Sequence, residues 1–549
     1  MEILTSEEMG AADRRTAEQF GVPLAELMEN AGTAVARFCL CRYPAAERVL
    51  VLCGKGNNGG DGFVAARVLA EAGVDVAVLL LAREDEVKGE ADHPSEQTRR
   101  GPRATALARL RAQAPSVAIW PVTGEAALAA ASGVIASAEL LIDAVVGTGF
   151  KPPLRGLPAA LRELVVNSAA PVVAVDLPSG WDADSLEQAA QDAFRADAVV
   201  TFTAPKLAHV FGHLTRSAFG PVAVAQIGSP AEAIVSTGNL SWAGASKAIA
   251  RQPREVNANK GKYGHVLVVG GSYGTAGAPS MASLAALRAG AGLVTAAVPK
   301  SILELVAGVA PELMLAPLRE GPEGALSLEN LAADGLKALL KAKKISVVAL
   351  GPGLSTKAEA PEFVRSLVAD CSLPMVIDAD ALNAFEGKAE LLNGSGRTLV
   401  LTPHPGEMAR LTGLTVAAVE ADRIHLARSF ATGHKLTLVL KGWRTLIAHP
   451  DGRVAVNTSG NPAMAKGGSG DILTGIVAAM LAQFPNDAAR AVEAAVALHG
   501  LAADFAARAM DEHTVLATDT LAHLSDAFRY RAKDADGLTW ICGLNEINT

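Results

Sequence analysis

The sequence predicts an α/β protein of two domains, each a parallel β-sheet with helices on both faces. Three observations lead to this fold class. The chain has 549 residues, more than one hydrophobic core usually organises. Short apolar runs alternate with helix-like stretches, and continuous runs of this kind are typical of strands buried on both faces. The runs end in polar, glycine-bearing turns, where the ligands of such sheets bind.

In the first half of the chain, apolar runs rich in Val, Leu and Ile are the expected strands. They occupy residues 48–54, 74–82, 139–147, 171–180 and 198–206. Residues 228–252 have no strong periodicity and contain Gly, Ser and Pro, which is typical of a boundary. We therefore divide the chain near Ser241, into domains of residues 1–235 and 245–530.

The same alternation of apolar runs and helix-like stretches resumes after the boundary and predicts a second parallel α/β domain. Its expected strands are residues 264–272, 293–299, 345–353, 373–382, 398–407 and 436–442. Residues 445–457 resemble a hairpin that turns at Asp451 and Gly452. The segment after about Ala532 has no clear place in either domain.

Composition and charge restrict the function. Half of the residues are apolar and 19% are charged, which excludes a disordered or coiled-coil chain. Lys and Arg number 49 against 57 Asp and Glu, a net charge of −8 without blocks of like charge. We therefore expect neither a nucleic acid nor a membrane as partner.

Cysteine use and targeting signals predict a cytoplasmic protein. The five cysteines lack the paired spacing of a zinc site or a disulfide framework. Residues 1–15 lack the apolar core of a signal peptide. The longest uncharged stretch, 266–287, contains Gly, Ser and Pro that do not favour a membrane-spanning helix. Parallel α/β domains often assemble, so we expect a homo-oligomer.

The strongest motif of the first domain is GKGNNGGDG at residues 54–62, between a strand and an amphipathic helix. Glycines allow close approach of a ligand, and the helix N-terminus attracts phosphate, so we expect a nucleotide or dinucleotide as the ligand. The alternative is a tight turn that needs glycine. Asn57, Asn58 and Asp61 add oxygen atoms that a turn does not require, which favours the binding site.

Three further strand ends of this domain carry oxygen groups. Asn58, Asp143 and Ser179 could together coordinate a monovalent cation, and Asp176 could act as an acid or base. The alternative is that such Asp residues cap helices or turns. Lys151, in the turn that follows Asp143, could pair with a ligand phosphate or be a solvated surface charge.

The strongest motif of the second domain lies at residues 457–481, where GGSGD precedes an apolar helix. Backbone N–H groups of Gly468, Ser469 and Gly470 would form an anion hole. Asp471 could take a proton from a hydroxyl that attacks the terminal phosphate of a nucleotide. This describes phosphoryl transfer, and the alternative for Asp471 alone is a helix cap.

Other strand ends of the second domain could complete the site. KGWRT (441–445) could line ribose and phosphates, and two prolines fix the backbone around His404. GSYGTAGAPS (271–280) and GPGL (351–354) are either ligand-binding turns or turns that only connect secondary-structure elements. DADAL (378–382) offers carboxylates either for a metal or for packing.

These motifs resemble a known family. GNNGGDG, DAVVGTGF and DLPSG resemble the NAD(P)HX epimerase domain. GSYGTAGA, GPGL, TPHPGEMARL, KGWRT and NPAMAKGGSGDILTG resemble the ADP-dependent NAD(P)HX dehydratase domain of the ribokinase-like superfamily. Fused in this order, over nearly the whole chain, they are similar to bifunctional NAD(P)H-hydrate repair enzymes. The resemblance implies two Rossmann-like three-layer domains, the second ribokinase-like.

The resemblance also implies activities and site residues. The first domain would interconvert the R and S hydrates of NADH and NADPH, and the second would dehydrate the S hydrate with ADP, using Mg²⁺. The first domain would bind the hydrate through Asn57, Asn58, Gly59, Gly60, Asp61, Gly147, Thr148, Gly149, Phe150, Lys151, Pro152, Pro153 and the catalytic Asp176, and K⁺ through Asn58, Asp143 and Ser179. In the second domain, Ala278, Gly353, His404 and the catalytic Asp471 would contact the hydrate, and Lys441, Gly442, Trp443, Arg444, Thr445 and Gly470 would hold ADP.

Two other functions fit part of the pattern. GGSGD alone suits a ribokinase-like small-molecule kinase, here fused to a nucleotide-binding domain. The first domain could instead be a nucleotide-sensing or RNA-associated scaffold. TPHPGE and the oxygen-bearing strand ends of the first domain argue against both.

Overall fold

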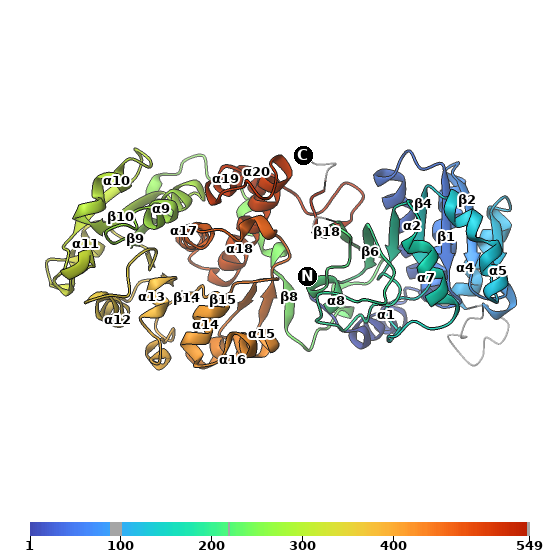
Figure 1. Cartoon of the computed structure of the whole chain (residues 1–549), viewed down its shortest axis with the longest axis horizontal. Helices are drawn as coiled ribbons and strands as arrows, with labels where there is room; N and C mark the ends of the chain where they lie inside the picture. Colours follow the sequence, from blue (N-terminus) through green and yellow to red (C-terminus); the bar gives the residue numbers. More distant parts are fainter. Residues whose placement is uncertain (88–100, 218–219, 546–549) are drawn as a thin grey trace. The chain divides into compact units, whose positions relative to one another are not determined.

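The computed structural model describes residues 1–87, 101–217 and 220–545, and it divides into two compact units. Unit 1 consists of Met1–Gly238 and Arg531–Thr549, and unit 2 of Asn239–Tyr530. Each unit has helices on both faces of a mostly parallel sheet (Figure 1), so the predicted α/β class is confirmed. Among the described residues, none of the helices combines the length and the apolar character needed to cross a membrane.

Unit 1 is built on an eight-stranded sheet in the order β18-β7-β6-β5-β4-β1-β2-β3. Neighbours are parallel except β18, which runs antiparallel to β7. Val51 of β1 pairs with Val78 and Ile142 on its two neighbours, which fixes the register. The strands are β1 (Arg48–Cys53), β2 (Asp75–Leu80), β3 (Ala118–Pro121), β4 (Leu140–Ala144), β5 (Val172–Val175), β6 (Ala198–Phe202), β7 (Val222–Ala225) and β18 (Thr539–Cys542).

Alternate residues of β1 pack on opposite layers of helices, as expected for a strand buried on both faces. Val49 and Val51 join the core formed with α2, α3 and α4, whereas Leu50 and Leu52 join the core formed with α5, α6 and α7. The helices of unit 1 are α1 (Ser6–Phe20), α2 (Leu24–Arg42), α3 (Asn57–Glu71), α4 (Pro102–Gln113), α5 (Glu125–Ala130), α6 (Ser132–Ser137), α7 (Leu157–Val166) and α8 (Leu207–Phe211).

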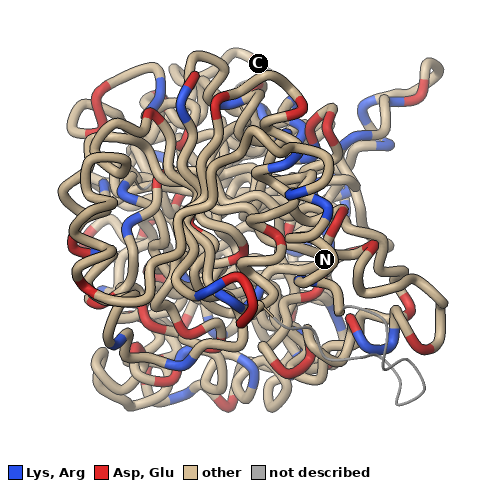
Figure 2. Tube along the Cα trace, turned by 90° about the vertical axis from the view of Figure 1, so that its right-hand side faces the viewer, with Lys and Arg blue, Asp and Glu red and all other residues tan. Residues whose placement is uncertain are grey.

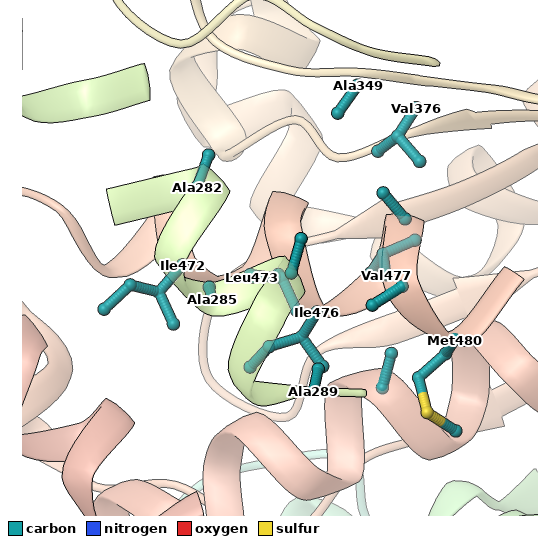
Figure 3. Packing of buried hydrophobic residues seen from close by; sticks show 14 of the residues in the cluster. Ala282, Ala285, Ala289, Ala349, Val376, Ile472, Leu473, Ile476, Val477 and Met480 are labelled. Carbon is teal, nitrogen blue, oxygen red and sulfur yellow. The ribbon is translucent and has the colours of Figure 1, made fainter. Parts of the chain in front are cut away.

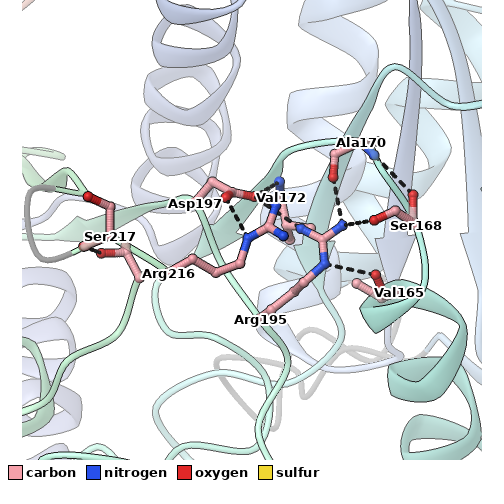
Figure 4. A network of polar contacts seen from close by, with 9 residues as sticks. Val165, Ser168, Ala170, Val172, Arg195, Asp197, Arg216 and Ser217 are labelled. Atoms are coloured by element: carbon pink, nitrogen blue, oxygen red, sulfur yellow. Dashed lines mark hydrogen bonds and ion pairs between the residues drawn. The ribbon is translucent and has the colours of Figure 1, made fainter.

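A polar network fixes the start of β5 (Figure 4). The Arg195 guanidinium donates to the carbonyls of Val165, Ser168 and Ala170 at 2.7–2.9 Å. Asp197 joins Arg195 to the backbone N–H of Val172. The network holds β5 in register, and with it the strand end that carries Asp176.

Unit 2 is built on a ten-stranded sheet in the order β11-β10-β9-β12-β13-β14-β15-β16-β17-β8. The strands are parallel except β16, which is antiparallel to both neighbours. The predicted hairpin at residues 445–457 is therefore confirmed. The strands are β8 (Leu240–Trp242), β9 (His265–Val269), β10 (Leu293–Pro299), β11 (Met314–Leu318), β12 (Val347–Leu350), β13 (Met375–Ile377), β14 (Leu399–Leu401), β15 (Thr437–Leu440), β16 (Leu446–Ala448) and β17 (Val454–Val456).

One face of this sheet is covered by a core of small and branched side chains from α9, α17 and α18 (Figure 3). A Cβ added to Gly475 of α17 would lie 2.1 Å from the carbonyl oxygen of Ala282 on α9, so only glycine allows this approach. The helices of unit 2 are α9 (Gly277–Arg288), α10 (Leu303–Ala307), α11 (Leu336–Ala342), α12 (Ala360–Asp370), α13 (Asp380–Asn383), α14 (Pro405–Thr412), α15 (Val416–Ala421), α16 (Arg423–His434), α17 (Ser469–Gln483), α18 (Ala488–Ala509), α19 (Ala517–Ala522) and α20 (Leu524–Arg529).

The structure adds five strands that the sequence patterns did not indicate: β3, β7, β8, β11 and β18. The segment after Ala532, left without a place by the sequence, belongs to unit 1. There Trp540 of β18 is buried against Phe38, with ring centroids 5.9 Å apart, and its indole N–H donates to Asp534. Basic and acidic residues are interspersed along the trace (Figure 2).

Candidate active sites

The carboxyl ends of β1, β4, β5, β6 and β7 in unit 1 surround a cavity of about 870 Å³. The Gly-rich turn after β1 opens α3, and the turn after β4 continues as GTGF. The sequence-predicted residues that line the cavity are Asn57, Asn58, Asp61, Gly147, Thr148, Gly149, Phe150 and Asp176. The structure therefore brings together, in one cavity, residues from three separate motifs.

Asp176 forms a buried ion pair with Lys206. The Lys206 Nζ lies 2.8 Å from Asp176 Oδ1, and Lys206 is 1% exposed. The Thr201 hydroxyl donates to the same oxygen, and the Thr148 hydroxyl and backbone N–H donate to Oδ2. Burial alone would raise the Asp176 pKa, but Lys206, His209 and these hydrogen bonds lower it below its usual value. Asp176 is therefore held as a carboxylate.

Two other carboxyl groups of the same cavity have pKa values shifted in the opposite direction. Burial, together with the negative charges of Asp176 and Asp13, raises the pKa of Asp61 well above its usual value. Burial raises the pKa of Asp13 to about 6, although the charge of Lys206 opposes the shift. Asp13 Oδ1 is buried and has no hydrogen-bond partner among the described residues.

Asp13 and Lys206 line the cavity but were not among the residues predicted from the sequence. A signal existed for each. Lys206 ends the apolar run 198–206, at the same sheet edge as the recognised motifs. Ser6, Met9, Gly10 and Asp13 have the spacing of one helix face, and all four line the cavity.

The predicted cation ligands lie at adjoining strand ends. Asp143 is fully buried and accepts hydrogen bonds from the Ser179 hydroxyl at 2.6 Å and the Ser179 backbone N–H at 2.7 Å. Burial raises the Asp143 pKa to about 6. The amide nitrogen of Asn58 is buried without a partner among the described residues. The oxygen atoms of Asp143 and Ser179 are compatible with a bound cation, whereas the Asn58 amide nitrogen is a hydrogen-bond donor and would not be a ligand.

The remaining predicted residues of unit 1 do not line the cavity. A Cβ on Gly59 would lie 1.8 Å from the Gly54 carbonyl oxygen, and one on Gly60 would lie 2.6 Å from Met28 Sδ. These two glycines therefore allow close packing of the turn. Lys151 binds Asp182 and Asp184 at 2.7 and 2.9 Å, and Pro152 and Pro153 follow it in an exposed stretch.

The second candidate site lies at the carboxyl ends of β13 and β15 and the start of α17 in unit 2. Lys441 Nζ lies 2.9 Å from Asp378 Oδ1 and 3.7 Å from Glu407 Oε2. The Thr474 hydroxyl donates to Asp378 Oδ2 at 2.7 Å. A Cβ on Gly470 would lie 3.3 Å from Lys441 Nζ, so the lysine reaches the first turn of α17.

Asp471 is partly buried in that first turn. Burial raises its pKa to about 7, and the charge of Asp378 contributes in the same direction, while Lys441 opposes it. Burial lowers the Lys441 pKa, but Asp378 and Glu407 raise it further, so Lys441 keeps its charge. Asp471 can thus exchange a proton near neutral pH beside a fixed cation. The sequence left Asp378 open between metal binding and packing, and the structure pairs it with Lys441.

His404 caps α14. The His404 Nδ1 accepts from the backbone N–H of Gly406 at 3.0 Å, and the backbone N–H of His404 donates to Glu407 Oε2 at 2.7 Å. The imidazole is half exposed, so its outer edge is open to solvent. The cap fixes the orientation of the ring at the end of β14.

The other predicted residues of unit 2 lie in the turns after β9, β12 and β15. Gly353 has a φ of 66°, and its carbonyl accepts from Thr275 Oγ1 at 2.7 Å, which joins the two glycine turns. Ala278 is the second residue of α9. Arg423 donates to the carbonyls of Leu440 and Lys441 at 3.4 Å, which fixes the start of the turn that continues through Gly442, Trp443, Arg444 and Thr445.

Comparison with known proteins gives matches to both units. Residues 24–208 match a family model described as YjeF-related protein N-terminus, and residues 266–527 one described as NAD(P)H-hydrate dehydratase. The bifunctional NAD(P)H-hydrate repair enzyme Nnr of Moorella thermoacetica is 40% identical, over 96% of this chain and 97% of its own. That of Escherichia coli is 35% identical, over 94% and 92%. A crystallised ADP/ATP-dependent NAD(P)H-hydrate dehydratase from Bacillus subtilis is 30% identical, over 51% and 96%, with a TM-score of 0.42.

Proposed function

The chain belongs to the family of bifunctional NAD(P)H-hydrate repair enzymes, and we propose that Asp471 is the base of its dehydratase reaction. The observation that carries the proposal is the Asp378–Lys441 ion pair beside Gly470 and Asp471. It places a fixed positive charge next to a carboxyl group whose pKa is about 7. A base of that pKa is well matched to a hydroxyl substrate at neutral pH.

The proposed reaction uses ADP to turn the ring hydroxyl into a leaving group. Asp471 takes the hydroxyl proton while the hydroxyl oxygen attacks the terminal phosphorus of ADP, and AMP leaves. Phosphate then leaves the ring carbon with the bonding electrons, as the ring nitrogen forms a double bond to that carbon. Loss of a proton from the adjacent carbon restores the dihydropyridine. Lys441 and the N–H groups of Ser469 and Gly470 would stabilise the phosphoryl charge.

Mg²⁺ fits this site as an ion carried by the nucleotide. Among the described residues, no group of three or more His, Cys, Asp and Glu side chains is arranged to hold a metal. Mg²⁺ commonly uses one or two carboxylates together with substrate phosphates, and Asp378 and Glu407 are available beside Lys441. When bound, the ion would neutralise phosphate charge. The turn of residues 441–445 and Gly470 would hold ADP, and Ala278, Gly353 and His404 would contact the hydrate.

In unit 1 we propose that the cavity binds the hydrate for epimerisation. Asn58, Asp143 and Ser179 would hold K⁺, which would supply positive charge next to the buried Asp143. The buried Asp143 carboxylate, with the Ser179 hydroxyl 2.6 Å away, supports this assignment because both groups offer oxygen ligands. We assign the epimerase to residues 1–235 and the dehydratase to residues 245–530. A homo-oligomeric state, a cytoplasmic location and the lack of nucleic-acid or membrane partners stay predictions from the sequence.

Replacement of Asp471 by Asn tests the proposed base. The amide has the same shape but cannot accept the proton, so we expect ADP-dependent dehydration of the S hydrate to fall by about 10²- to 10⁴-fold. The measurement is the rate at which the absorbance of reduced nicotinamide returns. Interconversion of the R and S hydrates, followed by chromatography, should continue at the wild-type rate.

The matched control is Asp487→Asn, at the start of α18, where the Asp487 carboxylate accepts from the Arg490 N–H. This variant should dehydrate the S hydrate at the wild-type rate. If Asp471→Asn did so too, Asp471 would not be the base. Phosphorylation of a vitamin alcohol without hydrate repair would favour the small-molecule kinase instead.

A further inference from the structure

The unit 1 cavity contains more ionisable groups than substrate binding requires. Three carboxyl groups line it, from α1, from α3 and from the end of β5, and one buried lysine faces them. The lysine pairs with only one of the three, Asp176. The other two, Asp13 and Asp61, are available for chemistry.

Asp176 is poorly suited to carry a proton. Oδ1 accepts from Lys206 and Thr201, and Oδ2 accepts from the Thr148 backbone N–H at 3.1 Å and from its hydroxyl. Protonation would break the ion pair and leave a buried ammonium group without its partner, which is strongly unfavourable. The sequence-based assignment of Asp176 as the acid or base therefore has a competitor in the same cavity.

Asp13 has the geometry that Asp176 lacks. It lines the cavity, and its Oδ1 is buried without a hydrogen-bond partner among the described residues. Its helix is firmly anchored, because Thr5 and Glu8 form a capping box and Ser6 donates to Asp184. The Leu4 N–H donates to the Pro205 carbonyl at 2.9 Å, so α1 begins beside Lys206. Asp13 is thus presented to the cavity on a rigid element.

We propose that Asp13 is a catalytic acid and base of the epimerase, exchanging a proton with the ring hydroxyl of the hydrate, with Asp61 as its uncharged neighbour. The proposal rests on the assignment of epimerisation to this cavity. The charged and titratable groups that act on Asp13 are Asp61, Asp176 and Lys206 in the cavity and Arg14, the next residue on α1. The raised pKa of Asp13 allows both of its protonation states near neutral pH.

The step can be written in full. Protonated Asp13 gives its proton to the ring hydroxyl, the carbon–oxygen bond breaks, and water leaves with the bonding pair. The lone pair of the ring nitrogen forms a double bond to the same carbon, which gives an iminium cation. Water then adds to the opposite face and returns a proton to Asp13. The carboxylate of Asp176 and the newly ionised Asp13 would stabilise the cation in this cavity.

The experiment follows conversion of the R hydrate to the S hydrate by the full chain without ADP. We expect Asp13→Asn to lower this rate by about 10²- to 10⁴-fold, the range for a lost acid or base. Dehydration of the S hydrate with ADP should keep its wild-type rate. The control Asp75→Asn changes an exposed Asp at the start of β2 and should epimerise normally.

A second variant separates catalysis from folding. Asp13→Glu keeps the carboxyl group on a longer side chain and should recover part of the lost epimerase rate. Asp13→Asn should have a thermal unfolding temperature equal to or higher than that of the wild type. Wild-type epimerisation by Asp13→Asn would overturn the proposal. Equal loss in the Asn and Glu variants with a lowered unfolding temperature would also overturn it, since Asp13 would then be structural. Absence of epimerisation in the wild-type chain would instead refute the assignment of the cavity.

Discussion

At the scale of single residues, environment decides what each carboxylate of the two sites can do. Asp176 is ion-paired and hydrogen-bonded on both oxygens, so it stays charged. Asp471, Asp13 and Asp61 lie where burial raises their pKa values. A carboxylate of the first kind is suited to orienting groups and stabilising charge, and one of the second kind is suited to proton transfer.

Most of these residues could be located from the sequence, but their protonation states could not be assigned from it. Each motif showed a strand end that carries a carboxylate, and parallel strands bring such ends together. Which of them meets a lysine depends on contacts between distant segments, such as Lys206 with Asp176 and Lys441 with Asp378. Asp13 was missed because α1 precedes the first strand, where no strand-end rule applies.

The Asp378 charge should appear in the pH dependence of the dehydratase. The proposed base must be ionised to accept a proton, so kcat/KM should rise as the pH increases through about 7, the pKa of Asp471. The negative charge of Asp378 raises that pKa. Asp378→Asn should therefore move the acidic limb to lower pH, by roughly one unit, and lower kcat because Lys441 loses its partner.

The control is Thr474→Val, which removes the hydrogen bond to Asp378 without a change of charge. Its acidic limb should coincide with that of the wild type. A limb that stays in place in Asp378→Asn would show that Asp378 does not act on the base electrostatically.

Among the secondary-structure elements, strands with long apolar runs could be predicted from the sequence, whereas the strands at the edges of the two sheets could not. The central strands of both sheets follow continuous apolar runs, which the sequence shows directly. The strands at the sheet edges, β3, β8, β11 and β18, were not predicted. Two of them depend on segments far along the chain, because β8 pairs with β17 and β18 pairs with β7. Close packing of α9 on α17 also depends on one glycine, Gly475, that looks unremarkable within its apolar helix.

β18 should contribute to the stability of unit 1, because Trp540 is buried and hydrogen-bonded there. Trp540→Ala would leave a cavity, and loss of a buried Trp commonly costs about 3–5 kcal/mol. Epimerase activity should therefore be lost at a lower urea concentration than in the wild type. Trp120→Ala, at a residue 45% exposed on β3, is the matched control and should change little. Equal behaviour of the two variants would mean that β18 adds no stability.

At the scale of the whole molecule, one chain carries two sites with different chemistry on sheets of the same class. In unit 1, carboxyl groups and one lysine surround a cavity at the strand ends. In unit 2, a glycine-rich helix start presents Asp471 beside Lys441. The order of the two units agrees with that of the curated relatives, which match over nearly their full lengths.

In the proposed dehydratase reaction, ADP phosphorylates the ring hydroxyl before the carbon–oxygen bond breaks. The most direct measurement uses the S hydrate labelled with ¹⁸O in that hydroxyl, together with ADP and the full chain, over the first turnovers. Attack of the hydroxyl on phosphorus followed by carbon–oxygen cleavage predicts one labelled oxygen in each inorganic phosphate released. Unlabelled phosphate, with the label in water, would contradict the account.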